Sequence, residues 1–222
     1  MSQFFIFAIF AALLGGCAAQ PENPFQYSGF LSAKYYDRLT KVESPGDKIL
    51  FRYINPDFKA ANYHHFLIDP VIAYPEPKET ENISIETMIS LQAKLTTLLE
   101  NGFSKVLPIA RTPGEGVLRF QTAITGVNVS AKDLEPYEYI PFALIAAGVN
   151  TAAGGRDQEV KLFLEGRFVD SVTNEVHAVG IRRISVEDLE NVKAKLQADQ
   201  LNEGLNTAAN DMVKALKGVF SN

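Results

Sequence analysis

The chain has 222 residues, a formal net charge of −5 at pH 7 and a single cysteine. An acidic balance argues against nucleic acid as a partner, because nucleic acid binding needs a basic surface, and against charge-driven binding of anionic lipid. One cysteine cannot form an intramolecular disulfide, so a hydrophobic core must hold the fold, and the length suffices for one domain.

The N-terminus predicts a lipoprotein signal peptide. An apolar run from Phe4 to Leu14 is shorter than the roughly 20 residues that a membrane-spanning helix needs. Small residues follow it, as a signal-cleavage site requires, and Leu14-Gly15-Gly16-Cys17 resembles the bacterial lipobox. This resemblance implies cleavage between Gly16 and Cys17 and attachment of lipid to Cys17. The alternative is a buried free cysteine on an apolar helix, and the absence of Lys and Arg before the apolar run departs from the usual leader.

The residue after the cysteine indicates in which membrane the lipoprotein is located. Ala18 stands where lipoproteins retained in the inner membrane typically carry aspartate, so the resemblance implies an outer-membrane lipoprotein with its domain in the periplasm. We expect residues 1–16 to be the signal peptide and residues 48–222 to be a single α+β domain. Between them, residues 17–47 would hold the lipidated cysteine, a proline-containing tether and an aromatic segment packed on the domain surface.

Alternating and β-branched residues predict six strands. The second contains Pro70, which lacks an N–H donor and therefore indicates an edge or a bulge. In the fourth, the apolar parity inverts at Gly126, which predicts a β-bulge. A turn at Thr173-Asn174 would join the last two as a hairpin. The predicted strands cover residues 48–54, 66–74, 104–110, 117–129, 160–170 and 176–186.

Three helical regions complete the pattern. Asn82 or Ser84 would cap a helix ending near Asn101-Gly102, with an apolar stripe made by Ile85, Met88, Ile89, Leu95 and Leu99. Residues 139–149 predict a short apolar helix, and residues 188–220 predict two helices or one kinked helix. Strands joined by hairpins favour an α+β fold, with a mostly antiparallel sheet of about five to six strands and helices packed on one face.

Several segments resemble the DUF3313 family of uncharacterised bacterial lipoproteins. They are the lipobox and residues 27–32, 68–71, 114–119 and 170–176. No activity is established for that family, so the resemblance implies no catalytic residues. The family often has glycine in the hairpin turn, where this chain has Asn174, which tolerates the left-handed conformation. The layout is also similar to lipoproteins of curli secretion and to cell-wall-synthase activators, which work by binding proteins.

Residue types that carry metal or nucleophilic chemistry do not converge in the sequence. His64 and His65 are adjacent, so on a strand they point to opposite faces and cannot easily share one ion with His177. No Gly-x-Ser-x-Gly motif marks a serine nucleophile, and Gly114-Glu115-Gly116 lacks the Lys-Ser/Thr of a phosphate-binding loop. The sequence therefore predicts no catalytic residue, no metal and no cofactor.

Residues 139–149 form the first candidate partner contact. This run is apolar and uncharged, and it is too short to span a bilayer. It packs in the core, or it forms a surface for a partner, for self-association or for the membrane. The contact residues would then be Tyr139, Phe142, Leu144 and Ile145.

A pair of adjacent arginines forms the second candidate contact. Arg182 and Arg183 lie within a predicted strand and must face opposite ways. Either they pair with Glu159 or Glu165 on the neighbouring strand, or Arg183 contacts an anion or a protein partner.

These observations favour a non-enzymatic outer-membrane lipoprotein. Its lipid on Cys17 would bind the membrane, and its domain would bind a protein partner, or a second copy, that the sequence does not identify. A carrier of a small apolar ligand is the first alternative and would need a cavity under the sheet. An envelope hydrolase with an unrecognised site is the second, and it would need convergent polar groups in a cleft.

Overall fold

The computed structural model describes residues 28–42, 50–77, 83–131, 158–189 and 199–221. The predictions for the signal peptide, for Cys17, for residues 139–149 and for residues 190–198 of the final helical region lie outside these residues.

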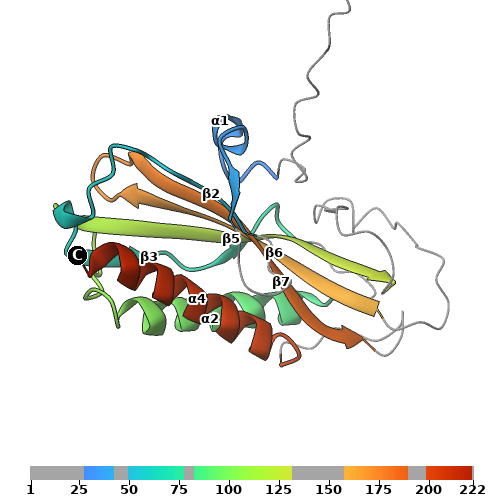
Figure 1. The fold of residues 1–222 in the computed structure, drawn as a ribbon. Helices are drawn as coiled ribbons and strands as arrows, with labels where there is room; N and C mark the ends of the chain where they lie inside the picture. The colour runs from blue at the N-terminus through green and yellow to red at the C-terminus, as the bar shows by residue number, and fades with distance from the viewer. Residues whose placement is uncertain (1–27, 43–49, 78–82, 132–157, 190–198, 222) are drawn as a thin grey trace, which may run out of the picture.

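A seven-stranded sheet runs through the molecule in the order β1-β2-β7-β6-β5-β3, with β4 also paired to β5 (Figure 1). All pairs are antiparallel except those of β3 and β4 with β5. The predicted α+β class and mostly antiparallel sheet are confirmed, and short edge strands raise the number of strands to seven. The strands are β1 (Thr40–Val42), β2 (Leu50–Ile54), β3 (His65–Ile68), β4 (Ile72–Ala73), β5 (Val117–Ala131), β6 (Gln158–Asp170) and β7 (Val176–Leu189).

The two long helices lie side by side on one face of the sheet. They are α2 (Ile85–Phe103) and α4 (Asn202–Phe220), and a four-residue helix, α1 (Ala33–Tyr36), lies on the opposite face (Figure 1). A 3₁₀ turn, η1 (Ala60–Asn62), precedes β3. Ser84 caps α2 as predicted, because its side chain accepts a hydrogen bond from the backbone N–H of Thr87 at 3.1 Å.

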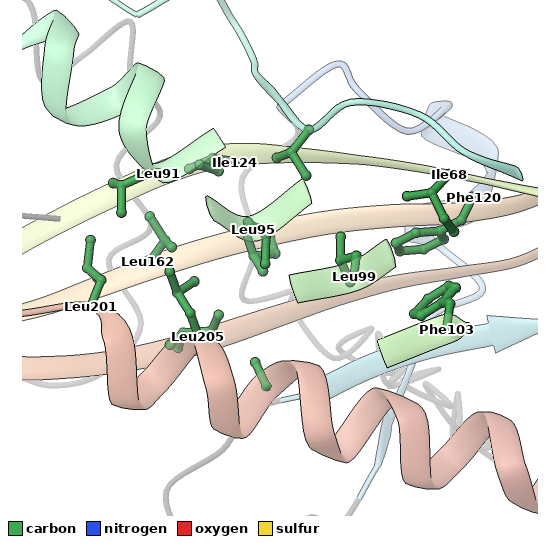
Figure 2. Close-up of a cluster of buried hydrophobic side chains, with 14 of the residues drawn as sticks. Ile68, Leu91, Leu95, Leu99, Phe103, Phe120, Ile124, Leu162, Leu201 and Leu205 are labelled. Carbon is green, nitrogen blue, oxygen red and sulfur yellow. The ribbon is translucent and has the colours of Figure 1, made fainter. Parts of the chain in front are cut away.

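The main core lies between the helices and the sheet. Figure 2 shows leucines of α2 and α4 pointing at apolar side chains of β3, β5 and β6. Five phenylalanines continue this core toward the C-terminal end of α4, with ring centroids 4.5 to 6.4 Å apart. Aromatic packing thus extends the described core to that end of the sheet. The five rings belong to Phe66, Phe103, Phe120, Phe168 and Phe220.

Local sequence rules account for the long strands. The register between β5 and β6 shifts between Ile124 and Gly126, which confirms the predicted bulge. The hairpin turn is also confirmed, and Asn174 adopts a left-handed conformation with φ 60°. The predicted second strand ends at Ile68 and resumes at Ile72, because Pro70 interrupts it at the sheet edge.

Three local predictions are wrong. Residues 104–110 form turns and only an isolated bridge from Ile109 to Phe66. The chain is still in β7 at Leu189, because pairing with β6 overrides the helical pattern there. Ile89 is 59% exposed, since the buried stripe of α2 instead runs through Met88, Leu91, Leu95 and Leu99.

The contact between α2 and α4 depends on a glycine. A Cβ added at Gly102 would lie 2.7 Å from Cγ2 of Val213, a side chain that is stiff because it is β-branched. We expect Gly102→Ala to lower the free energy of unfolding by roughly 1–3 kcal/mol relative to Gly218→Ala, as measured by urea denaturation.

Gly218 is the matched control, because it lies in α4 and a Cβ there meets nothing within 4 Å. Gly218→Ala should be neutral or stabilising by up to about 1 kcal/mol. Equal stabilities of the two variants would show that the helices do not approach this closely.

Candidate functional site

The N-terminal segment, residues 28–39, packs on the sheet face opposite α2 and α4. Leu31 is 1% exposed, and Tyr36 at the end of α1 is buried beside it. They form a second core with side chains of β6 and β7, namely Phe163, Val179 and Ile181. Both faces of the sheet are therefore covered, one by helices and the other by the segment that follows the predicted tether.

A buried carboxyl group lies under this segment. Glu165 of β6 is 1% exposed, and the Tyr36 hydroxyl donates a hydrogen bond of 2.5 Å to its Oε2. Interactions with the side chains of Ser28 and Thr125 and with the backbone of Leu31 lower the pKa of the carboxyl group. The Ser28 hydroxyl in turn lies 3.1 Å from the Tyr36 hydroxyl. We call Ser28, Leu31, Tyr36 and Glu165 the Glu165 cluster.

Burial sets the protonation of this cluster. Desolvation raises the pKa of Glu165 above its ordinary value of 4.5, although hydrogen bonds from Tyr36 and Ser28 act in the opposite direction. Burial also raises the pKa of Tyr36, and the nearby charge of Glu165 adds to that effect. The hydroxyl of Tyr36 therefore stays protonated and remains a donor to the carboxyl group.

A polar row crosses the same face toward the β3 edge. The Asp69 carboxylate accepts hydrogen bonds from Arg119 Nε at 2.9 and 3.0 Å and from Gln121 Nε2 at 2.9 Å. The Nε of Arg167 donates to Gln121 Oε1 at 2.8 Å, and the Arg167 guanidinium lies 5.3 Å from the ring centroid of Phe30. This row connects the sheet to the N-terminal segment through Phe30.

A third cluster lies at the hairpin end of the sheet. The Tyr63 hydroxyl donates to Asp170 Oδ2 at 3.0 Å and lies 2.6 Å from Nε2 of His177, while Phe58 stacks on the Tyr63 ring. Burial alone would raise the pKa of Asp170, but hydrogen bonds, above all those from the backbone N–H groups of Thr173 and Val172, hold it below its ordinary value of 3.8. Burial and the neighbouring Asp170 raise the pKa of Tyr63.

The three clusters act mainly within the fold. Glu165 and His177 are 1% and 7% exposed, so neither presents its polar atoms to a substrate in bulk water. Asp170 and Asp69 accept hydrogen bonds from the turn and from neighbouring strands, which fixes their orientation. These contacts join segments that are distant in sequence and hold the domain together.

The two arginines occupy different surroundings. Arg182 faces the helices and pairs with Asp211 of α4 at 2.5 Å, whereas the sequence favoured Glu159 or Glu165. Arg183 is 4% exposed on the sheet face that the N-terminal segment covers, and its predicted contact with a partner stays a prediction.

The remaining predicted residues are dispersed. His64 and His65 are exposed, whereas His177 is buried beside Tyr63. Within the described part of the chain, no group of three His, Cys, Asp or Glu residues could hold a metal ion. Gly16, Cys17, Tyr139, Phe142, Leu144 and Ile145 lie outside the described residues.

No helix in the described ranges is both long and apolar enough to cross a bilayer.

The chain belongs to the family described as "Protein of unknown function (DUF3313)", which matches residues 26–212 and confirms the predicted family. A relative from Escherichia coli (strain K12), "Uncharacterized lipoprotein YdcL", is 30% identical over 210 residues, which cover 92% of this chain and 94% of that protein.

Two solved structures are distantly similar. The PelC dodecamer from Paraburkholderia phytofirmans is 9% identical with a TM-score of 0.34, over 78% of this chain and 97% of that chain. Protein XCC0632 from Xanthomonas campestris is 13% identical with a TM-score of 0.37, over 75% of this chain and 90% of that chain. Similarity at this level carries no information about what the chain does.

The raised pKa of Glu165 gives a testable pH dependence. The folded protein holds this proton more tightly than the unfolded chain, so the group's stabilising contribution is complete below about pH 4.5 and declines as pH rises toward the folded pKa. Glu165→Gln removes this titration. We therefore expect the free energy of unfolding of Glu165→Gln, relative to wild type, to increase from about pH 5 to about pH 8 in urea denaturation.

Asp170→Asn is the control, because a carboxyl group with a lowered pKa is ionised in both states over this range. Its difference from wild type should stay constant. If the Glu165→Gln difference were equally constant, Glu165 would not be buried as described.

Proposed function

We propose that this chain is an outer-membrane lipoprotein, anchored through lipid on Cys17, whose periplasmic domain binds a protein partner of the envelope and catalyses no reaction. Membership of a family with an uncharacterised lipoprotein relative supports the anchor. The sequence Leu14-Gly15-Gly16-Cys17 supports the same anchor by its resemblance to a lipobox.

The observation that carries this proposal is the packing of the N-terminal segment. Tyr36 hydrogen-bonds Glu165 of the central strand, and the described part of the segment begins at Ser28, only eleven residues after Cys17. A tether of that length reaches at most about 40 Å when extended. The lipid would therefore hold a rigid domain at the membrane surface, and not a loosely linked one.

The arrangement of the helices supports binding by the domain. The outer surface of α2 and α4 lies on the side away from the N-terminal segment (Figure 1). It includes Ile89, which is 59% exposed although it is a large apolar residue. A rigid domain with a free helical surface suits docking, and the polar clusters described above are engaged in holding that domain together.

The anchor is tested by Cys17→Ser expressed in bacterial cells. We expect the variant to keep its signal peptide, to incorporate no labelled palmitate and to be absent from the outer-membrane fraction, because serine lacks the thiol that accepts the lipid. Wild type should be shorter, labelled and recovered with the outer membrane. Normal maturation of Cys17→Ser would contradict the anchor.

The same cells test the binding role. A photo-crosslinking amino acid at Ile89 should capture one defined envelope protein in wild type and lose it in Cys17→Ser, where the domain is not delivered. The matched control is the same amino acid at buried Leu95, which should give no adduct. Equal adducts from both positions, or none from Ile89, would count against docking on the helices.

A further inference from the structure

We propose that the outer surface of α1 and β1 docks on an anionic phospholipid bilayer, so that the domain rests on the membrane with the N-terminal segment toward the lipid. This inference rests on the lipid anchor of the proposed function. It adds which face of the domain meets the membrane, and by which residues.

Two tyrosines and two cations form the centre of this surface. The rings of Tyr35 in α1 and Tyr53 in β2 lie 6.0 Å apart. The Nζ of Lys34 lies 4.9 Å from the ring centroid of Tyr35, and the Arg38 guanidinium lies 5.5 Å from that of Tyr53. Arg38 also donates to the Tyr53 hydroxyl at 3.4 Å. Both cations are exposed, so their charges are available to solvent.

A third cation extends the surface along β1. Lys41 is exposed and pairs directly with Phe51, so it shares the sheet face on which Phe51 and Tyr53 pack against the N-terminal segment. Asp37 is the one exposed acidic residue among residues 28–42, against three exposed basic residues. A local excess of positive charge therefore stands on a chain whose net charge is −5.

Among the residues that the structure describes, the other charged groups on this face do not reverse that excess. Arg119 is paired with Asp69, and Arg167 stacks on Phe30. Glu165 is buried under the segment, and exposed Glu76 follows Tyr74, whose ring packs on that of Phe30.

The anchor makes a bilayer the fitting occupant. The chain enters this face at Ser28, eleven residues after the predicted lipidated cysteine, so the surface cannot move more than about 40 Å from the acyl chains. Lys and Arg next to an anchor attract anionic headgroups, and tyrosine rings favour the headgroup region. Docking by this surface would leave α2 and α4, on the opposite face of the sheet, pointing away from the membrane (Figure 1).

Headgroup proximity tests the orientation. The mature lipoprotein is reconstituted in phosphatidylcholine vesicles with or without phosphatidylglycerol. A fluorophore is attached to a cysteine introduced at Ser32 or at Ala93. These two residues are exposed on opposite faces of the domain. Quenchers sit on the lipid headgroups. We expect strong quenching at Ser32 but not at Ala93 when phosphatidylglycerol is present, and loss of the difference in pure phosphatidylcholine or at high salt.

Charge reversal tests whether the three basic residues of this surface bind the membrane. Lys34→Glu/Arg38→Glu/Lys41→Glu should lower the ratio of docked to undocked protein at least about tenfold. Lys105→Glu/Lys214→Glu/Lys217→Glu makes the same charge change at exposed positions near α2 and α4 and should leave quenching at Ser32 unchanged. Unaltered thermal unfolding of both triple variants would exclude a folding defect as the cause.

Co-flotation with vesicles separates the two proposals. Wild type and both triple variants should float with pure phosphatidylcholine vesicles, since the acyl chains insert without charge. Failure to float would overturn the lipid anchor and this inference together. Flotation with equal quenching at Ser32 and Ala93 in phosphatidylglycerol vesicles would overturn this inference alone, and the basic surface would then serve an acidic protein.

Discussion

The fold depends on how one buried carboxyl group is satisfied. Glu165 lies in the middle of the central strand, and desolvation of a carboxylate there is costly unless donors replace water. Tyr36 and Ser28 of the N-terminal segment act as donors, as does Thr125 of β5. The segment in turn buries Leu31 and Tyr36 against β6 and β7. The buried carboxyl group and the N-terminal segment therefore stabilise each other. Both faces of the sheet are covered as a result.

Much of the architecture could be predicted from the sequence, because the long elements are strongly patterned. The alternation of Leu118, Phe120 and Ile124 with polar residues defines the helix-facing side of β5, and the inversion at Gly126 indicates the bulge. Elements at the edge of the sheet were harder to predict from the sequence. Residues 104–110 are apolar like a strand, but they make only an isolated bridge from Ile109. The predicted start of the last helical region was wrong, because the pairing of β7 with β6 outweighs the local helical periodicity at Leu189.

The Glu165 cluster could not be predicted, because pattern alone does not tell a solvated face from one that another segment covers. Glu165 alternates with apolar residues as an exposed residue would, yet it is buried. The available signal was the density of aromatic residues in the N-terminal segment, which predicted packing but not its place. Arg183 illustrates the same difficulty: its charge suggested a surface contact, whereas the sheet places it inside.

The central claim is that the segment leading to the predicted anchor is an integral part of the domain. Hydrogen exchange of the Leu31 amide in the full chain, followed by NMR, tests it most directly, because Leu31 is 1% exposed in the core that the segment forms with β6 and β7. The account predicts that this amide exchanges as slowly as core amides of β6, and faster in Tyr36→Phe. Exchange at the rate of an exposed tether would contradict it.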